Sequence, residues 1–178
     1  LLVFSDFNYG CLPDCVVNEM IQLSKEHQVF IAADSQSSSQ IGDISRYKDV
    51  DLLTPTEREA RIAVRDHNSG LVVLAESLRK STNAKNILLK LGEEGVLIHA
   101  IEENKVEYLT DRISALKSSP LDVSGAGDSM LITSAMTLCL GGGVCQAALI
   151  GSVAAAMQVS RLGNRPLKMQ ELQAAVKG

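Results

Sequence analysis

Short apolar runs alternate with segments of helical periodicity in the first half of the chain, and this alternation is what most constrains the fold. Strand-like runs lie at 1–5, 29–33, 51–54 and 87–91. Apolar residues at helical spacing predict helices at about 13–25, from residue 55 onward, and at about 68–80. Such alternation is typical of an α/β fold, in which helices cover a mostly parallel sheet.

The second half of the chain has a different pattern. Strands are expected at 95–100 and 106–109, and the polar stretch 102–105 between them predicts an antiparallel hairpin. Helices are expected at about 125–140, 144–161 and 167–176, with glycine-rich or proline-containing breaks between them. The 178 residues contain no repeat and no linker, and they suffice for one domain.

Polar residues follow several of the expected strands. Asp6, Asp34, the stretch 54–59 and Gly92 all come at or just after a strand end. In open sheets of this kind, ligands bind at the carboxyl ends of the strands. The sequence therefore predicts that these residues contribute to one shared site.

A string of small residues with an acid at each end, 122–128 (DVSGAGD), precedes a long apolar helical run. The first N–H groups of a helix have no intrahelical partner, and the helix dipole favours anions such as phosphate there. A carboxylate beside phosphate is repelled by it, unless it binds a metal or accepts a proton. Asp128 is placed as a base for a hydroxyl that attacks phosphorus. The alternative is an ordinary capped helix start.

The same string resembles the C-terminal signature of the ribokinase/PfkB carbohydrate kinase family. The resemblance implies a three-layer ribokinase-like fold, with Asp128 as catalytic base. It also implies that Gly125, Ala126 and Gly127 form an anion hole and that Asp122 helps to hold a monovalent cation. Residues 1–178 match the C-terminal portion of a single kinase domain. The family's N-terminal part and lid, through which members often form homodimers, are expected to lie outside this stretch.

Three further segments extend the resemblance. The stretch 53–59 is similar to the family's Thr-Pro-Asn-x-x-Glu segment, which implies that Glu59 helps to organise Mg²⁺ and that Thr56, in place of Asn, contacts the nucleotide. The stretch 90–95 resembles a nucleotide-binding strand and turn. It implies that ATP is bound by Lys90, Gly92 and Gly95. Ser152 corresponds to a polar residue that contacts adenine in several members.

The stretch 5–10 (SDFNYG) resembles a segment of the kinases that phosphorylate a heptose 7-phosphate in ADP-heptose synthesis, with Tyr9 in place of a lysine. This implies that Asp6 binds the substrate. The predicted function is ATP-dependent phosphorylation of a sugar or sugar phosphate. One alternative is a non-catalytic nucleotide- or sugar-binding relative, because Thr56 and Tyr9 depart from the family pattern. A dinucleotide-binding oxidoreductase is a weaker alternative, because no Gly-x-Gly-x-x-Gly loop follows the first strand.

Composition argues against several other classes of protein and site. A net charge of −4 argues against nucleic acid as a partner, since such proteins usually carry a basic patch. No apolar run is long enough to span a membrane without polar interruption. The four cysteines form no CxxC pair, so a zinc site is not expected. We expect them to be reduced thiols in a cytoplasmic protein.

Overall fold

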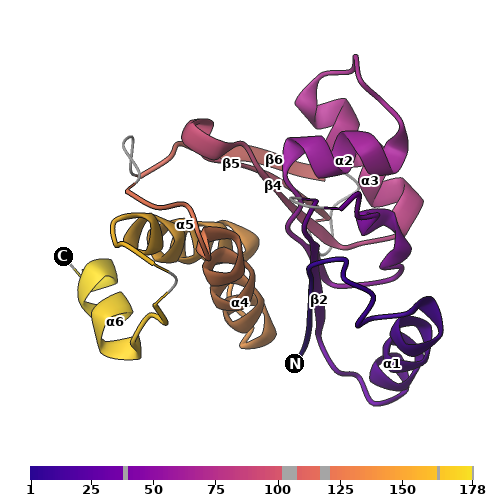
Figure 1. Ribbon diagram of the computed structural model, residues 1–178, viewed down its shortest axis with the longest axis horizontal. Helices are drawn as coiled ribbons and strands as arrows, with labels where there is room; N and C mark the ends of the chain where they lie inside the picture. The colour runs from indigo at the N-terminus through magenta and orange to yellow at the C-terminus, as the bar shows by residue number, and fades with distance from the viewer. Residues whose placement is uncertain (38–39, 102–107, 117–120, 164, 178) are drawn as a thin grey trace.

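A computed structural model of the chain describes residues 1–37, 40–101, 108–116, 121–163 and 165–177 (Figure 1). Within these ranges the strands form one sheet in sequence order: β1 (Leu2–Asp6), β2 (Ile31–Ser35), β3 (Leu52–Leu53), β4 (Asn86–Lys90), β5 (Val96–Ile101) and β6 (Tyr108–Ile113). Strands β1 to β4 are parallel, whereas β5 and β6 are antiparallel to their neighbours. The mostly parallel sheet with an antiparallel addition is confirmed.

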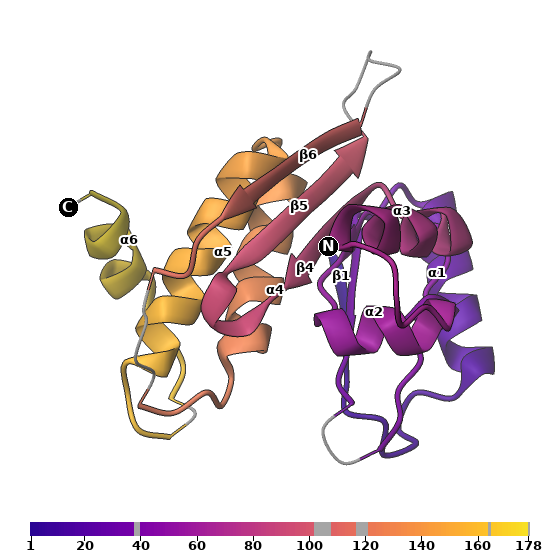
Figure 2. The ribbon, with the colours of Figure 1, turned by 90° about the horizontal axis from the view of Figure 1, so that it is seen from above.

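Helices cover both faces of the sheet, which gives three layers (Figures 1 and 2). One face carries α1 (Asp14–Glu26), α2 (Glu57–Val64) and α3 (Leu71–Thr82). The other face carries α4 (Ala126–Cys139) and α5 (Val144–Val159), and α6 (Met169–Lys177) packs on α5. Two short 3₁₀ turns, η1 (Ile44–Arg46) and η2 (Gly92–Glu94), complete the described elements.

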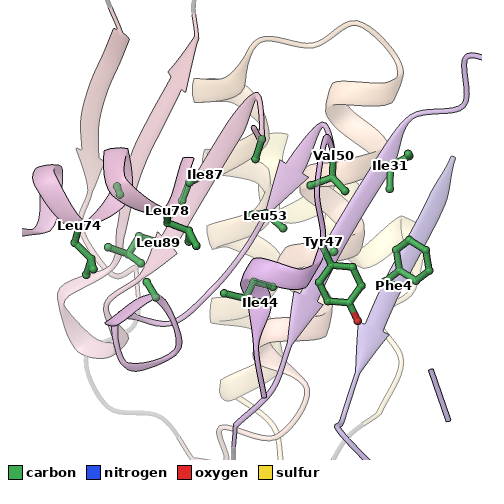
Figure 3. Close-up of a cluster of buried hydrophobic side chains, with 14 of the residues drawn as sticks. Phe4, Ile31, Ile44, Tyr47, Val50, Leu53, Leu74, Leu78, Ile87 and Leu89 are labelled. Carbon is green, nitrogen blue, oxygen red and sulfur yellow. The ribbon is translucent and has the colours of Figure 1, made fainter. Parts of the chain in front are cut away.

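Side chains alternate along the inner strands between two hydrophobic cores. Ala33 and Leu89 belong to the core beneath α1 to α3, which Figure 3 shows, whereas Ala32 and Leu88 pack toward α4 and α5. Burial of both faces explains why the inner strands are continuous apolar runs. The same alternation directs Asp34 and Lys90, two residues beyond Ala32 and Leu88, toward α4.

Strand β6 is the element that the sequence predicted least well. The expected strand covered 106–109, of which 106 and 107 lie outside the described residues, and the structure extends the strand to Ile113. Its residues include Thr110, Asp111 and Arg112 and are largely exposed. The strand forms mainly because its main chain pairs with β5 at the edge of the sheet, although its last residue, Ile113, packs against the core under α4 and α5.

Two expectations from composition can be compared with the structure. All four cysteines are free thiols, and all four are exposed. Among the described residues, no helix has the length and apolar character needed to cross a bilayer.

Glu76 on α3 is the centre of a polar network between that helix and the β5–β6 pair. Its carboxylate accepts a hydrogen bond from Arg79 at 2.7 Å and lies 2.9 Å from Nε2 of His99. The Arg79 guanidinium in turn lies over the Tyr108 ring, 4.6 Å from its centroid. The hydrogen bond from Arg79, with help from His99, lowers the pKa of Glu76 to about 2.

This network predicts a pH-dependent contribution to stability. A carboxyl group whose pKa is lower in the folded state stabilises the fold above its unfolded pKa, and this contribution is lost as the pH falls toward the folded pKa. We expect Glu76→Gln to lower the free energy of unfolding by about 1 kcal/mol at pH 7, and the difference from wild type to shrink by about half at pH 3. Urea titrations at both pH values measure it. Glu57→Gln is the control and should have a smaller effect, because it removes an ion pair with Arg61 from a more exposed carboxylate, 42% against 18% for Glu76.

Candidate active site

A cavity of about 820 Å³ opens between the carboxyl ends of the inner strands and the start of α4. It is lined by polar groups from the loop after β2, from the start of α2 and from the end of β4, and by small or apolar side chains of α5. Nine of the twelve predicted site residues lie in this lining: Thr56, Glu59, Lys90, Gly92, Gly95, Gly125, Ala126, Gly127 and Ser152. The structure therefore brings together segments that are far apart in the sequence.

The start of α4 presents main-chain donors to this cavity. Gly125 is the N-cap and has a left-handed backbone with φ 76°, which glycine adopts without strain. The Ala126 N–H donates to the carbonyl of Val123 at 3.3 Å. Among the described residues, the N–H groups of Gly125, Gly127 and Asp128 have no acceptor, as expected at a helix start. The N–H groups available to an anion are thus those of Gly125, Gly127 and Asp128. The Ala126 N–H, which belongs to the predicted trio, is already partly engaged by Val123.

Asp128 lies in the first turn of α4, beside Gly127 at the edge of the cavity and outside the lining itself. The side chain is half-buried, and its Oδ1 accepts a hydrogen bond from the Ser5 hydroxyl at 2.9 Å. In the described part of the chain Oδ2 has no hydrogen-bond donor, so it is available to accept a proton. Ser5 comes from β1, and its contact fixes the carboxylate against the end of that strand.

Lys90 and Asp34 form an ion pair at the floor of the site. Nζ of Lys90 lies 2.6 Å from Oδ2 of Asp34, which is 1% exposed. Burial raises the pKa of Asp34, the Lys90 charge lowers it, and the carboxylates of Glu59 and Asp128 raise it. The Glu59 and Asp128 carboxylates are thus near enough for their charges to act on Asp34, whereas the Lys90 ammonium contacts Asp34 directly.

Glu59 is held by the main chain. Its Oε2 accepts the Thr56 N–H at 2.7 Å and its Oε1 accepts the Ser37 N–H at 3.0 Å, while the Thr56 hydroxyl accepts the Glu59 N–H at 3.3 Å. This reciprocal pair is a capping box at the start of α2, and it ties the loop after β2 to that helix. Glu59 is 6% exposed, which excludes a role as part of a solvated helix face.

Asp122 and Asp6, like Asp128, lie outside the cavity lining. Asp122 accepts the N–H of Ser124 and of Gly163, each at 2.9 Å, and these bonds lower the pKa of its carboxyl group. The largest contribution to the lowered pKa is a hydrogen bond from the Ser124 side chain, ahead of the two main-chain bonds. Asp122 therefore fastens the loop before α4 to the loop after α5. Among the described residues, no three or more His, Cys, Asp or Glu side chains are grouped as a metal site would require.

Asp6 faces the side of the sheet opposite to α4. Its carboxylate accepts the Asn8 N–H at 2.8 Å and the Tyr47 hydroxyl at 3.0 Å, and it lies 3.6 Å from the Arg46 guanidinium. Burial, followed by the charge of Asp6, raises the pKa of Tyr47. Ser5 and Asp6 are neighbours in the chain but point to opposite faces, so Asp6 is not grouped with Asp128.

Sequence reasoning expected Asp34 in the shared site without giving it a chemical role, and it did not single out Ser5 or Ser37, although all three contact predicted site residues. The signal for Asp34 was present, because it is the one charged residue in β2 and ends an otherwise apolar run. Nothing in the local sequence distinguishes Ser5 or Ser37 from other serines near strand ends.

The family model for pfkB family carbohydrate kinases matches residues 1–170, and the chain belongs to this family. Similar curated proteins include the bifunctional protein HldE of Wolinella succinogenes, 29% identical over 167 residues that cover 92% of this chain and 33% of the relative. The corresponding protein of Proteus mirabilis is 29% identical over 179 residues, covering 99% and 35% of the two chains. The chain thus spans about a third of the length of these relatives.

Solved structures support the fold. Phosphofructokinase-2 from Escherichia coli in complex with substrates and products has a TM-score of 0.79 at 17% identity, covering 99% of this chain and 56% of that chain. Ribokinase from Arabidopsis thaliana complexed with ribose and ATP has a TM-score of 0.76 at 19% identity, covering 93% and 53%. The expected ribokinase-like fold is confirmed.

Proposed function

We propose that this chain supplies the phosphoryl-transfer site of an ATP-dependent kinase that acts on a hydroxyl group of a sugar or sugar phosphate. The observation that carries the proposal is the start of α4, where unpaired N–H groups, the Asp128 carboxylate and the Lys90 ammonium surround one end of a cavity. Apolar side chains of α5 and Ser152 line the same cavity and suit a nucleobase.

In this proposal Asp128 accepts the proton of the sugar hydroxyl while the hydroxyl oxygen attacks the γ-phosphorus of ATP. The bond from that phosphorus to the β–γ bridging oxygen breaks, and ADP leaves with the electron pair. The N–H groups of Gly125, Gly127 and Asp128 stabilise the charge on the transferred group, while Gly92, Gly95 and Thr56 lie along the nucleotide. Positioning and fixed dipoles supply most of what phosphoryl transfer requires.

Mg²⁺ is compatible with the donors present, because this ion is usually held by one or two carboxylates together with substrate phosphates and waters. When bound, it would neutralise charge on the phosphates. Both oxygens of Glu59 already accept main-chain N–H bonds, so Glu59 would act on the ion through water. Asp122 would stabilise the loop beside a monovalent cation.

A heptose 7-phosphate is the first substrate to test, because the stretch 5–10 resembles that branch of the family and the similar curated proteins carry the name HldE. Asp6 would then support the substrate by holding the turn at Asn8, since both of its oxygens are already engaged. A cytoplasmic location is part of this proposal. A homodimer through the family's N-terminal lid is part of the same proposal.

A nucleotide-binding relative without turnover is the second candidate. It is favoured by Thr56, whose hydroxyl accepts the Glu59 N–H in the helix cap and which has no amide N–H to donate as asparagine would. Calorimetry with MgATP on the full-length protein, followed by an assay of ADP release with a panel of sugars and sugar phosphates, separates the two. Sugar-dependent ADP release is expected. Binding without turnover would favour the second candidate, and no binding would exclude both.

A further inference from the structure

The ion pair between Lys90 and Asp34 joins two strands, β4 and β2, that are not neighbours in the sheet. Strand β3 lies between β2 and β4, but it contains only Leu52 and Leu53. The side chains of Asp34 and Lys90 therefore meet across the end of this short strand, on the face that carries α4. The last residue of β4 also forms an isolated parallel bridge with Thr56, which fixes the backbone of Lys90 at the cavity.

The first turn of α4 lies directly against this pair. A methyl group at Gly127 would come within 3.2 Å of Nζ of Lys90 and 3.6 Å of Oδ2 of Asp34. Glycine at this position thus lets the ammonium approach the main chain of the helix start. Two positive features, the ammonium and the partly positive end of the helix, are brought together, and Asp34 compensates for their mutual repulsion.

The Lys90 ammonium has N–H donors left with which to bind a ligand. A lysine side chain carries three N–H donors, and in the described part of the chain Asp34 is its one hydrogen-bond partner. Lys90 lines the cavity, whereas Asp34 lies beneath it and is almost fully buried. The remaining donors are next to the unpaired N–H groups of Gly127 and Asp128.

On the basis of the function proposed above, we infer that Lys90 binds the γ-phosphate of ATP together with the start of α4, and that Asp34 is a positioning residue that holds the Lys90 ammonium there. Asp34 itself does not touch the phosphate, because its negative charge would repel it. Its contribution is therefore indirect and depends on the presence of Lys90.

The test is a double-mutant cycle of nucleotide binding, measured by calorimetry on the full-length protein. We expect Lys90→Met to weaken MgATP binding about 10- to 100-fold, as for loss of a charged hydrogen bond, and MgADP binding less than about threefold. Asp34→Asn should weaken MgATP binding about threefold or more when Lys90 is present. In the Lys90→Met background the same change should not weaken it, since it then only removes a repelling charge.

A matched control exists at the other end of β4, where Lys85 pairs with Asp51 at 2.7 Å. Lys85→Met should leave both nucleotide affinities unchanged. Equal weakening of MgATP and MgADP by Lys90→Met, with a lowered Tm, would assign the pair a structural role and overturn the inference. An Asp34→Asn effect of the same size in both backgrounds would also overturn it. Failure of the wild-type protein to bind MgATP would instead overturn the proposed function, and the inference with it.

Discussion

Replacement of Asp128 by asparagine is expected to lower kcat by about 10²- to 10⁴-fold, the usual contribution of a general base. Asparagine keeps the size of the side chain and can still accept the Ser5 hydrogen bond, but it cannot take a proton from the attacking hydroxyl. The KM for MgATP should change far less, because the charge removed is a repelling one. Steady-state kinetics of the full-length protein with its sugar substrate measure both parameters.

Two control variants separate the base from its surroundings. Ser5→Ala removes the hydrogen bond that orients the carboxylate and should lower kcat by less than about tenfold. Asp14→Asn removes the same charge from the first turn of α1, on the opposite face of the sheet, and should have no effect on kcat. A near-normal kcat for Asp128→Asn would show that another group accepts the proton.

The architecture could be predicted because the inner strands are buried on both faces and therefore stand out as apolar runs. Strand β6 could be predicted only in part, since it is an exposed edge strand held by main-chain pairing with β5. The cavity could be anticipated from the rule that ligands bind at the carboxyl ends of parallel strands. Local patterns thus identified the segments that meet there.

Local patterns could not identify which side chains within those segments face each other. Asp6 was predicted in the site and Ser5 was not, yet it is Ser5 that contacts Asp128, 123 positions along the chain. Alternation alone shows that the two point to opposite faces, but which face receives α4 depends on the packing of the whole sheet. The same holds for Asp34 and Lys90, whose contact requires β3 to be short.

Gly95→Ala is expected to reduce the free energy of unfolding by at least about 3 kcal/mol, the sum of backbone strain and a severe contact. Gly95 has φ 96° and ψ −133°, a region that is open to glycine and strained for other residues. A methyl group there would lie 2.0 Å from the carbonyl oxygen of Ile113 and 2.7 Å from the Ala115 nitrogen, both in the backbone. Neither atom can move without shifting the segment that follows β6.

Gly92 is the matched control in the same turn. It has φ 60° and open space around the position of an added methyl group, so Gly92→Ala should cost only about 1 kcal/mol. Urea denaturation of both variants measures the difference, with MgATP affinity as a second readout. Because Ala115 and Leu116 line the cavity, displacement of this segment should make Gly95→Ala weaken MgATP binding along with the fold. Equal stability losses for the two variants would contradict the prediction and would mean that the 113–115 backbone yields easily.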